Sequence, residues 1–326
     1  MRVAVIGAGS WGSALAVLAV RRRAETVLVA RDDEVARLLE TDRRHPRRHA
    51  GYVFPEALRA TTDIDAVLAA DIVVLAVPSA AVRETLERVA RLSSGAVLVS
   101  AVKGFEISTG RRVSEVAAEF LPSTAFAVLS GPTFAEGVLR GDPSAAVVAS
   151  ADPRAAERVQ QTLSGPDFRL YRSDDVLGVE ISGGMKNVVA IAAGIVSGLG
   201  LGHNTLAALV TRGLAEIARL VLALGGKQKT LLGLAGVGDL MLTCTGDLSR
   251  NRRLGEAIGR GTEPSAAIAG SSEVAEGSLA CLAAVRLAES AGTDLPITEA
   301  VRRVLYEGLS PRIAIQELMG RGLKAE

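Results

Sequence analysis

The chain begins with a short apolar run that ends in a glycine-rich loop, and this combination strongly limits its fold. Residues 3–6 are typical of a buried strand, Gly7-Ala8-Gly9-Ser10-Trp11-Gly12 follows at once, and a helical pattern continues to about Val20. In such a loop Gly7 permits a tight turn, Gly9 lets the backbone approach a pyrophosphate, and Gly12 allows close packing of helix against strand. The free N–H groups and positive dipole end of the helix attract the pyrophosphate. The loop therefore predicts a dinucleotide site, the alternative being a merely tight strand-to-helix turn.

The rest of the chain divides into two patterns. Apolar runs rich in β-branched residues recur at 26–30, 72–77, 96–100, 126–129 and 145–148, with helical patterns between them. Such runs are typical of a parallel sheet covered on both faces. From about residue 174 the strand signals stop, and Ala, Leu and Gly at helical spacing dominate. We predict an α/β fold: a Rossmann-type doubly wound, NAD(P)-binding domain over residues 1–174, followed by an all-helical substrate-binding domain over residues 175–326.

Composition excludes several classes of partner. Lys plus Arg number 37 against 36 for Asp plus Glu, which gives no general reason to expect nucleic acid or an anionic membrane. The two cysteines, Cys244 and Cys281, form no metal-ligand cluster and fit a reducing, cytoplasmic location. The N-terminal apolar run is too short for a signal peptide. The apolar stretch 187–212 is broken by glycines that include Gly194 and Gly198, so we expect a buried helix pair and no membrane span.

The end of the second strand bears on the choice of cofactor. NAD-preferring folds commonly place an acid there to bind the ribose 2′-OH. Arg31 occupies or adjoins that place, and a guanidinium favours the 2′-phosphate of NADPH over NADH. Asp32 is one step away, so use of both cofactors stays open, as does a merely solvated Arg31.

Three charged residues lie in apolar, glycine-rich surroundings. Lys103 follows the fourth strand run, at the carboxyl edge where ligands bind in such sheets. Lys186 lies at the head of the most apolar helix, where lost hydration lowers the pKa of a lysine and suits it to proton exchange with a carbonyl or alcohol oxygen. Asp239 is the partner we expect for Lys186. The alternatives are a solvated lysine, a lysine that snorkels from a helix end, and a plain helix N-cap.

A polar cluster, Ser249-Arg250-Asn251-Arg252-Arg253, combines a hydroxyl, an amide and three guanidinium groups. Arginine offers a planar fork of donors that matches phosphate oxygens. With Ser249 as N-cap, the cluster would hold a dianionic phosphate at a helix start. A solvated basic helix face is the usual alternative.

Together these motifs resemble the bacterial-type NAD(P)H-dependent glycerol-3-phosphate dehydrogenases over nearly the whole chain. Besides the glycine loop and the polar cluster, the resemblance rests on five further segments: Val102-Lys103-Gly104, Leu129-Ser130-Gly131-Pro132-Thr133-Phe134-Ala135, Gly183-Gly184-Met185-Lys186-Asn187-Val188, Thr211-Arg212-Gly213-Leu214-Ala215-Glu216 and Gly233-Leu234-Ala235-Gly236-Val237-Gly238-Asp239-Leu240. All of the motifs occur in the family's order.

The resemblance implies an activity and a set of site residues. The family interconverts dihydroxyacetone phosphate and sn-glycerol 3-phosphate, supplies the latter for phospholipid synthesis, and is usually a homodimer. Residues implied to contact the dinucleotide are Ser10, Trp11, Arg31, Lys103, Ala135, Arg250, Val274 and Glu276. Residues implied to surround the substrate are Lys103, Gly131, Thr133, Lys186, Asp239, Ser249, Arg250 and Asn251. Lys186 would transfer the proton, and both lysines would meet in the cleft between the two domains.

The chain departs from the family pattern in places. The basic stretch from Arg43 to His49 replaces a segment that usually contains Asn, and its role stays open. Arg22 and Arg23 precede the second strand, where they would add to phosphate binding on the adenosine side. The rival functions are another reductase of similar architecture, such as a β-hydroxyacid dehydrogenase or ketopantoate reductase, and a catalytically silent NADP(H)-sensing regulator.

Overall fold

The structure, a computed structural model, describes residues 1–270 and 275–322. The chain forms two compact units that are each discontinuous in sequence. The sheet unit comprises Met1–Val102 and Arg111–Glu180, and the helical unit comprises Lys103–Gly110 and Ile181–Glu326. This division falls after Glu180, whereas the sequence placed the boundary after residue 174. The sequence also did not indicate that the short segment Lys103–Gly110 belongs with the helices.

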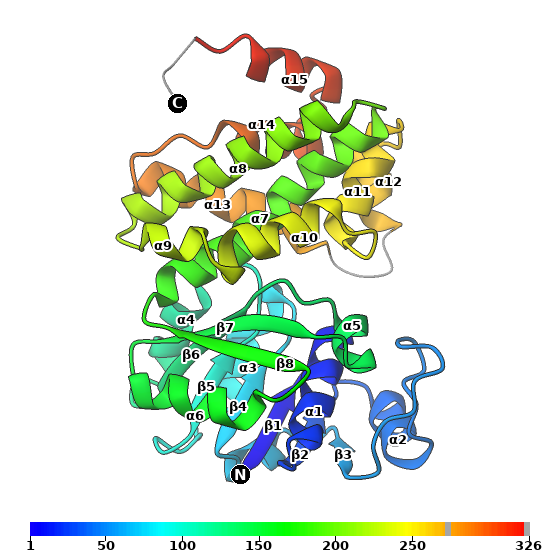
Figure 1. Cartoon of the computed structure of the whole chain (residues 1–326), viewed down its shortest axis with the longest axis vertical. Coiled ribbons are helices and arrows are strands. Elements are labelled where there is room, and N and C mark those ends of the chain that lie inside the picture. Colours follow the sequence, from blue (N-terminus) through cyan, green and yellow to red (C-terminus); the bar gives the residue numbers. More distant parts are fainter. Residues whose placement is uncertain (271–274, 323–326) are drawn as a thin grey trace. The chain divides into compact units, whose positions relative to one another are not determined.

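The sheet unit is built on one eight-stranded sheet with the order β3-β2-β1-β4-β5-β6-β7-β8 (Figure 1). Its strands are β1 (Arg2–Ile6), β2 (Glu25–Val29), β3 (Leu58–Thr61), β4 (Ile72–Leu75), β5 (Val97–Ser100), β6 (Ala125–Ser130), β7 (Ser144–Ser150) and β8 (Phe168–Ser173). All neighbouring pairs are parallel except β6 and β7, which are antiparallel. The doubly wound fold is therefore confirmed. The purely parallel sheet is corrected at β7, and the two edge strands, β3 and β8, were not predicted.

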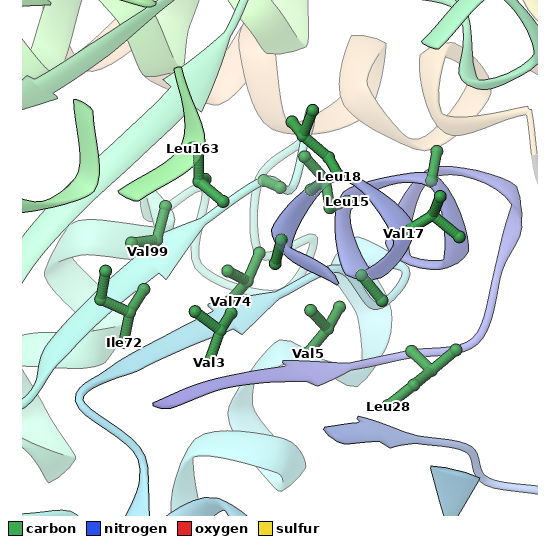
Figure 2. Close-up of a cluster of buried hydrophobic side chains, with 14 of the residues drawn as sticks. Val3, Val5, Leu15, Val17, Leu18, Leu28, Ile72, Val74, Val99 and Leu163 are labelled. Atoms are coloured by element: carbon green, nitrogen blue, oxygen red, sulfur yellow. The ribbon is translucent and has the colours of Figure 1, made fainter. Parts of the chain in front are cut away.

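Both faces of the sheet are buried, which explains the continuous apolar runs. Along β1, Val3 and Val5 belong to one core cluster and Ala4 and Ile6 to the other. Figure 2 shows the first cluster, in which side chains from the strands meet those of the helix that follows the glycine loop. Because successive strand residues point to opposite faces, a sheet covered on both sides needs apolar residues at every position.

Helices cover these two faces. The first cluster is covered by α1 (Ser10–Arg21), α2 (Asp33–Thr41), α5 (Ala135–Arg140) and α6 (Pro153–Leu163). The second is covered by η1 (Ile64–Ala69), α3 (Val82–Arg88), which the short turn η2 (Ser79–Ala81) precedes, and α4 (Val113–Phe120).

Helix α1 returns the chain from the carboxyl ends of the strands to their amino ends. It starts beyond the carboxyl end of β1 and ends before Glu25, which pairs with Arg2 at the amino end of β1. Arg22 therefore lies at the edge opposite the glycine loop, where its guanidinium pairs with Asp167. The prediction that Arg22 adds to phosphate binding on the adenosine side is therefore wrong, because Arg22 lies far from the glycine loop and pairs with Asp167.

The helical unit contains the remaining helices, in agreement with the all-helical prediction (Figure 1). They are α8 (His203–Ala223), α9 (Gln228–Leu231), the π-turn η3 (Leu234–Gly238), α10 (Asp239–Thr245), α11 (Arg250–Gly259), α12 (Pro264–Ala269), α13 (Glu276–Ser290), α14 (Pro296–Tyr306) and α15 (Pro311–Met319). Helix α7 (Val176–Gly198) begins in the sheet unit and continues into this one.

Helix α7 is packed so closely that its neighbours meet it through glycine. A Cβ atom at Gly255 of α11 would lie 2.0 Å from the carbonyl oxygen of Ile191, and one at Gly277 of α13 would lie 2.5 Å from that of Asn187. A Cβ atom at Gly213 of α8 would lie 2.6 Å from the side chain of Val189. Because these glycines come from three different helices, α7 is the helix on which α8, α11 and α13 all pack.

The glycines inside α7 serve the same packing. Gly194 was expected to break the apolar stretch, but α7 runs through it and ends at Gly198, and both glycines face the backbone of α11. The break lies at residues 199–202, between α7 and α8, so the expected helix pair is confirmed, although only α7 is buried along most of its length. Among the described residues α7 is long and apolar enough to cross a membrane, but its most apolar stretch is 100% buried within the protein. A second candidate arises only if the bent stretch Gln228–Thr245 and Arg250–Gly259 counts as one span.

We predict that Gly255→Ala destabilises the protein. The added methyl would meet backbone atoms of Ile191 and Ile195 within 2.0 to 2.9 Å, so α11 would have to move away from α7. Overpacking of this kind costs about 1–3 kcal/mol of the free energy of unfolding. Urea titration followed by circular dichroism measures it. The control is Gly95→Ala, whose Cβ would meet only the Ser93 hydroxyl at 3.6 Å; equal midpoints for the two variants would contradict this account of the packing.

Candidate active site

The glycine loop has the geometry that its sequence predicts. Gly7 has φ of +110°, and a Cβ there would lie 2.5 Å from the carbonyl oxygen of Ala76. A Cβ at Gly12 would lie 1.9 Å from the carbonyl oxygen of Gly7, so the helix start and the turn touch directly. At Gly9, by contrast, a Cβ would meet nothing within 4 Å. The space above Gly9 is therefore open to a ligand.

The N-terminus of α1 is suited to an anion. No side chain caps it, and its first turn contains no acidic residue. The indole Nε1 of Trp11 is buried and has no hydrogen-bond partner among the described residues. A buried donor without a partner costs free energy unless a ligand or water accepts from it. The open glycine, the uncapped N–H groups and this indole all fit a bound pyrophosphate.

The loop after β6 adds residues at the same edge of the sheet. Because β6 is parallel to β5, its carboxyl end lies at the edge where the glycine loop begins. Gly131 follows this strand, and Thr133 donates its backbone N–H to the Gly131 carbonyl over 2.8 Å. Ala135 is the first residue of α5. These residues therefore occupy the short connection between the end of β6 and the start of α5.

The end of β2 carries Arg31 and Asp32, which differ in their surroundings. Arg31 is exposed and makes no ion pair within the described parts of the chain. Asp32 is the N-cap of α2: its Oδ1 accepts from the N–H of Glu34 over 2.9 Å and from that of Val35 over 3.3 Å. Of the two, Arg31 is the charged group without an ionic partner among residues 1–270 and 275–322.

Lys186 lies in the interior of α7 rather than at its head. The helix begins at Val176 and continues through Gly183-Gly184, where the absence of a side chain at Gly184 makes room for the ring of Phe105. The Lys186 side chain is only 7% exposed. Its Nζ lies 2.9 Å from Asp239 Oδ1 and 2.6 Å from Thr243 Oγ1. The expected ion pair with Asp239 is confirmed, and a snorkelling lysine is excluded.

Lys103 reaches the same carboxylate from another segment. Its Nζ lies 2.6 Å from Asp239 Oδ2, and its side chain is 18% exposed. Asn187, the residue after Lys186, donates its side-chain N–H to the Lys103 carbonyl over 2.9 Å. Two lysines that are distant in sequence therefore meet at one aspartate within the helical unit, which we call the Lys–Asp–Lys cluster.

The local backbone explains why Asp239 can serve both lysines. The glycine-rich stretch before it forms a π-turn, η3, in which a Cβ at Gly236 would lie 2.3 Å from the carbonyl oxygen of Leu231. Helix α10 then begins at Asp239, whose side chain is 2% exposed. Departures from α-helical winding of this kind occur often at functional sites. The carboxylate is thus held in the interior, where it needs charged partners.

Burial and charge set the protonation of the cluster. Burial lowers the pKa of Lys186 to about 8; Asp239 opposes this shift and Lys103 adds to it. Burial alone would raise the pKa of Asp239, but the charges of Lys103 and then Lys186 hold it below its usual value. The carboxylate is therefore ionised at neutral pH, while Lys186 can both give and take a proton near that pH.

The polar cluster from Ser249 to Arg253 divides into different roles. Ser249 is the N-cap of α11, as predicted, and its hydroxyl accepts from the Arg252 N–H over 3.2 Å. Arg252 pairs with Asp247 over 3.0 Å, whereas Arg250 and Arg253 are exposed. The alternative interpretation, a solvated basic helix face, therefore applies to Arg250 and Arg253 and not to the whole cluster.

Asn251 is buried and tied to two other segments. Its Nδ2 donates to Asn187 Oδ1 over 3.0 Å, and its Oδ1 accepts from the Gly277 N–H over 2.9 Å. Since Asn187 also holds Lys103, one chain of amides connects the start of α11 with the Lys–Asp–Lys cluster. Glu276 is the first residue of α13, and Val274 lies outside the described residues.

Two residues near the lysines were missed by the sequence prediction. Thr243 accepts a hydrogen bond from Lys186 and donates to the Asp239 carbonyl over 2.6 Å. Asn187 donates to the Lys103 carbonyl, but the sequence placed it only within a motif. The scarcity of asparagine, which occurs only at positions 187, 204 and 251, is the signal that could have identified it. A threonine four residues after an aspartate gives no comparable signal.

We predict that Asp239→Asn strongly destabilises the protein, because it leaves the buried ammonium of Lys186 and the partly buried one of Lys103 without their counter-ion. Breaking a buried pair costs roughly 3–5 kcal/mol of the free energy of unfolding. Chemical denaturation at pH 7 measures the loss. Asp247→Asn is the matched control, since that side chain is 94% exposed and its pair with Arg252 contributes little. Similar losses in the two variants would show that the buried cluster carries no special electrostatic weight.

Comparisons with known proteins identify the family of the chain. Two family models match the chain: the N-terminus of NAD-dependent glycerol-3-phosphate dehydrogenase at residues 2–156 and its C-terminus at residues 175–316. Glycerol-3-phosphate dehydrogenase (NAD(P)+) of Xanthomonas campestris pv. campestris strain B100 is 45% identical over 328 residues, covering 100% of this chain and 96% of that protein. Its counterpart from Geobacter sulfurreducens is 46% identical over 330 residues, covering 100% and 98%.

A solved structure gives the same result. The crystal structure of glycerol-3-phosphate dehydrogenase from Coxiella burnetii matches with a TM-score of 0.94 and 38% identity, over 98% of this chain and 99% of that one. Sequence and structure together show that the chain belongs to the NAD-dependent glycerol-3-phosphate dehydrogenase family.

Proposed function

We propose that the chain is an oxidoreductase that interconverts dihydroxyacetone phosphate and sn-glycerol 3-phosphate with NADPH or NADH. The observation that carries the proposal is the Lys–Asp–Lys cluster, in which buried Lys186 and partly buried Lys103 share Asp239 over 2.9 and 2.6 Å. A silent nucleotide sensor would have no need of this costly burial of charge. In this proposal residues 1–174 bind the dinucleotide and residues 175–326 bind the substrate.

The dinucleotide would be held first by the glycine loop. Gly7, Gly9 and Gly12 shape the loop, Ser10 and Trp11 lie at the start of α1, and Arg31 follows β2. When bound, the nicotinamide supplies the hydride that reduces the ketone carbon. Family resemblance adds further contacts to this set: Lys103, Ala135, Arg250, Val274 and Glu276.

Lys186 is the residue that we assign to proton transfer. As an ammonium it would polarise the ketone oxygen and then donate its proton to the oxyanion that develops there. Its pKa of about 8 suits both directions of the reaction. Asp239 and Thr243 hold its Nζ, and Lys103 would place a second positive charge beside the substrate.

The phosphate of the substrate would lie at the start of α11. Ser249 caps this helix, exposed Arg250 follows it, and Asn251 connects it with the lysines through Asn187. Arg250 would supply the fork of donors for the dianion. Gly131 and Thr133 complete the substrate-binding set from resemblance. Anchoring the remote phosphate restricts the reacting carbon to a productive position.

The cellular role and assembly follow from the family. We infer a cytoplasmic homodimer that supplies glycerol 3-phosphate for phospholipid synthesis. Both cysteines are free thiols, which agrees with a reducing compartment. Light scattering coupled to size-exclusion chromatography tests the dimer.

We expect NADPH oxidation with dihydroxyacetone phosphate and little with unphosphorylated dihydroxyacetone. Arg250→Ala should raise KM for the phosphorylated ketone about 10-fold or more, with a smaller change in kcat, because the lost contact is made in ground state and transition state alike. Arg253→Ala, which removes an exposed guanidinium from the same helix, is the control. Equal rates with both ketones in the parent enzyme would exclude the phosphate site.

The pH dependence should follow the protonation of Lys186. Ketone reduction needs the ammonium, so kcat should fall as pH rises through about 8, while alcohol oxidation needs the amine and should rise over the same range. Lys186→Ala should lower kcat by at least about 10²-fold and leave the dinucleotide Kd nearly unchanged. Steady-state kinetics in both directions measures these changes. Lys229→Ala, at an exposed position, is the control, and near-normal turnover of Lys186→Ala would defeat the assignment.

A further inference from the structure

The basic segment, residues 43–49, is held against the glycine loop by two histidines. His45 Nε2 lies 2.8 Å from the carbonyl oxygen of Ala8, and His49 Nε2 lies 3.1 Å from that of Ser10. His45 is buried, and Arg43 anchors the start of the segment by donating to the Leu58 carbonyl over 2.7 Å. A segment that carries four arginines is therefore fixed beside the predicted pyrophosphate site.

His45 also fixes the position of Arg47. A carbonyl oxygen only accepts, so His45 Nε2 carries the proton, and its Nδ1 is free to accept from the Arg47 backbone N–H over 3.2 Å. The neutral imidazole thus bridges the glycine loop and Arg47. Burial, together with the charges of Arg48, His49 and Arg47, keeps the pKa of His45 below its usual value, against the raising effect of the Ala8 bond.

The Arg47 guanidinium in turn pairs with Asp32 at the end of β2. It donates to Oδ2 of that carboxylate, while Oδ1 caps α2 through the N–H groups of Glu34 and Val35. The hydrogen bond from Arg47 is the largest cause of the lowered pKa of Asp32. Both oxygens of the carboxylate therefore have protein partners, and its charge is balanced by a residue from a distant loop.

We propose that Arg47 determines cofactor specificity: by pairing with Asp32 it withdraws the acid that would bind the 2′-hydroxyl of NADH and leaves exposed Arg31 to bind the 2′-phosphate of NADPH. The inference rests on the dinucleotide site of the proposed function. An acid about 20 residues after the glycine loop is the usual acceptor for the 2′-hydroxyl, and Asp32 has that spacing from Gly12. Arg47 acts through Asp32 and is a positioning residue.

Electrostatics gives the direction of the effect. An unpaired carboxylate beside a 2′-phosphate would repel it, whereas a free Oδ2 would accept from a 2′-hydroxyl. Loss of the guanidinium should therefore weaken NADPH and strengthen or spare NADH. The preference for NADPH is set by a residue outside the strand end where specificity is usually sought.

The test is a double-mutant cycle of Arg47→Gln and Asp32→Asn, because Asn caps a helix as well as Asp and preserves α2. Kd for NADPH and NADH is measured by fluorescence of Trp11, the single tryptophan, which needs no turnover. Arg47→Gln should lower the ratio of the NADH Kd to the NADPH Kd about 3-fold, because the Arg47–Asp32 pair is partly exposed to solvent. In the Asp32→Asn background the same substitution should change that ratio little. Arg44→Gln, an equal loss of charge at an exposed position in the segment, is the matched control.

Three results would overturn the inference. They are a wild-type chain that binds NADH more tightly than NADPH, an Arg47→Gln variant with the parental ratio, and an undiminished effect of Arg47→Gln when Asp32 is already Asn. The last would mean that Arg47 contacts the phosphate itself. A chain that binds both nucleotides in the expected ratios yet does not reduce dihydroxyacetone phosphate would refute the proposed reaction and leave this inference standing.

Discussion

A buried carboxylate that serves two ammonium groups is the interaction on which the helical unit and its chemistry depend. Removing these charges from water costs several kcal/mol for each ion, and only close mutual contact offsets that cost. Asp239 provides the contact because a π-turn places it at the start of α10, 2% exposed. Two ammonium groups and one carboxylate leave a formal excess of one positive charge. In a site of low dielectric, such an excess stabilises negative charge that develops on a nearby oxygen.

The central strands were predictable because a strand that is buried on both faces is apolar at every position, which is visible in the sequence. The runs that became β1, β2, β4, β5, β6 and β7 were all identified from this pattern. The edge strands β3 and β8 have a weaker sequence signal, because they contain exposed or partly exposed residues between the buried ones. Their sequences therefore resemble those of loops. The antiparallel direction of β7 could not be predicted from the sequence either, because side chains alternate between the two faces in parallel and antiparallel strands alike. Direction is set by the connection, which here contains the short helix α5.

The candidate site was predictable where a charge stood among apolar residues and therefore needed a partner. Lys186 and Asp239 are of this kind. Lys186 was wrongly placed at the head of its helix, since it lies in the interior of α7. Only the tertiary contact of Gly184 with Phe105 shows why glycine occurs there. Partners supplied by irregular segments could not be derived. Nothing local to the sequence says that His45 meets Ala8.

The discontinuity of the two units has a consequence for any attempt to separate them. A cut after residue 174 would give a C-terminal fragment without Lys103–Gly110, although that segment belongs to the helical unit. Such a fragment would keep Lys186 and Asp239 but lose the second lysine, and it would expose the gap at Gly184 that Phe105 fills. The helical unit of this chain is therefore not encoded as one continuous piece, and an exchange of halves between related proteins must carry the eight residues Lys103–Gly110 with it.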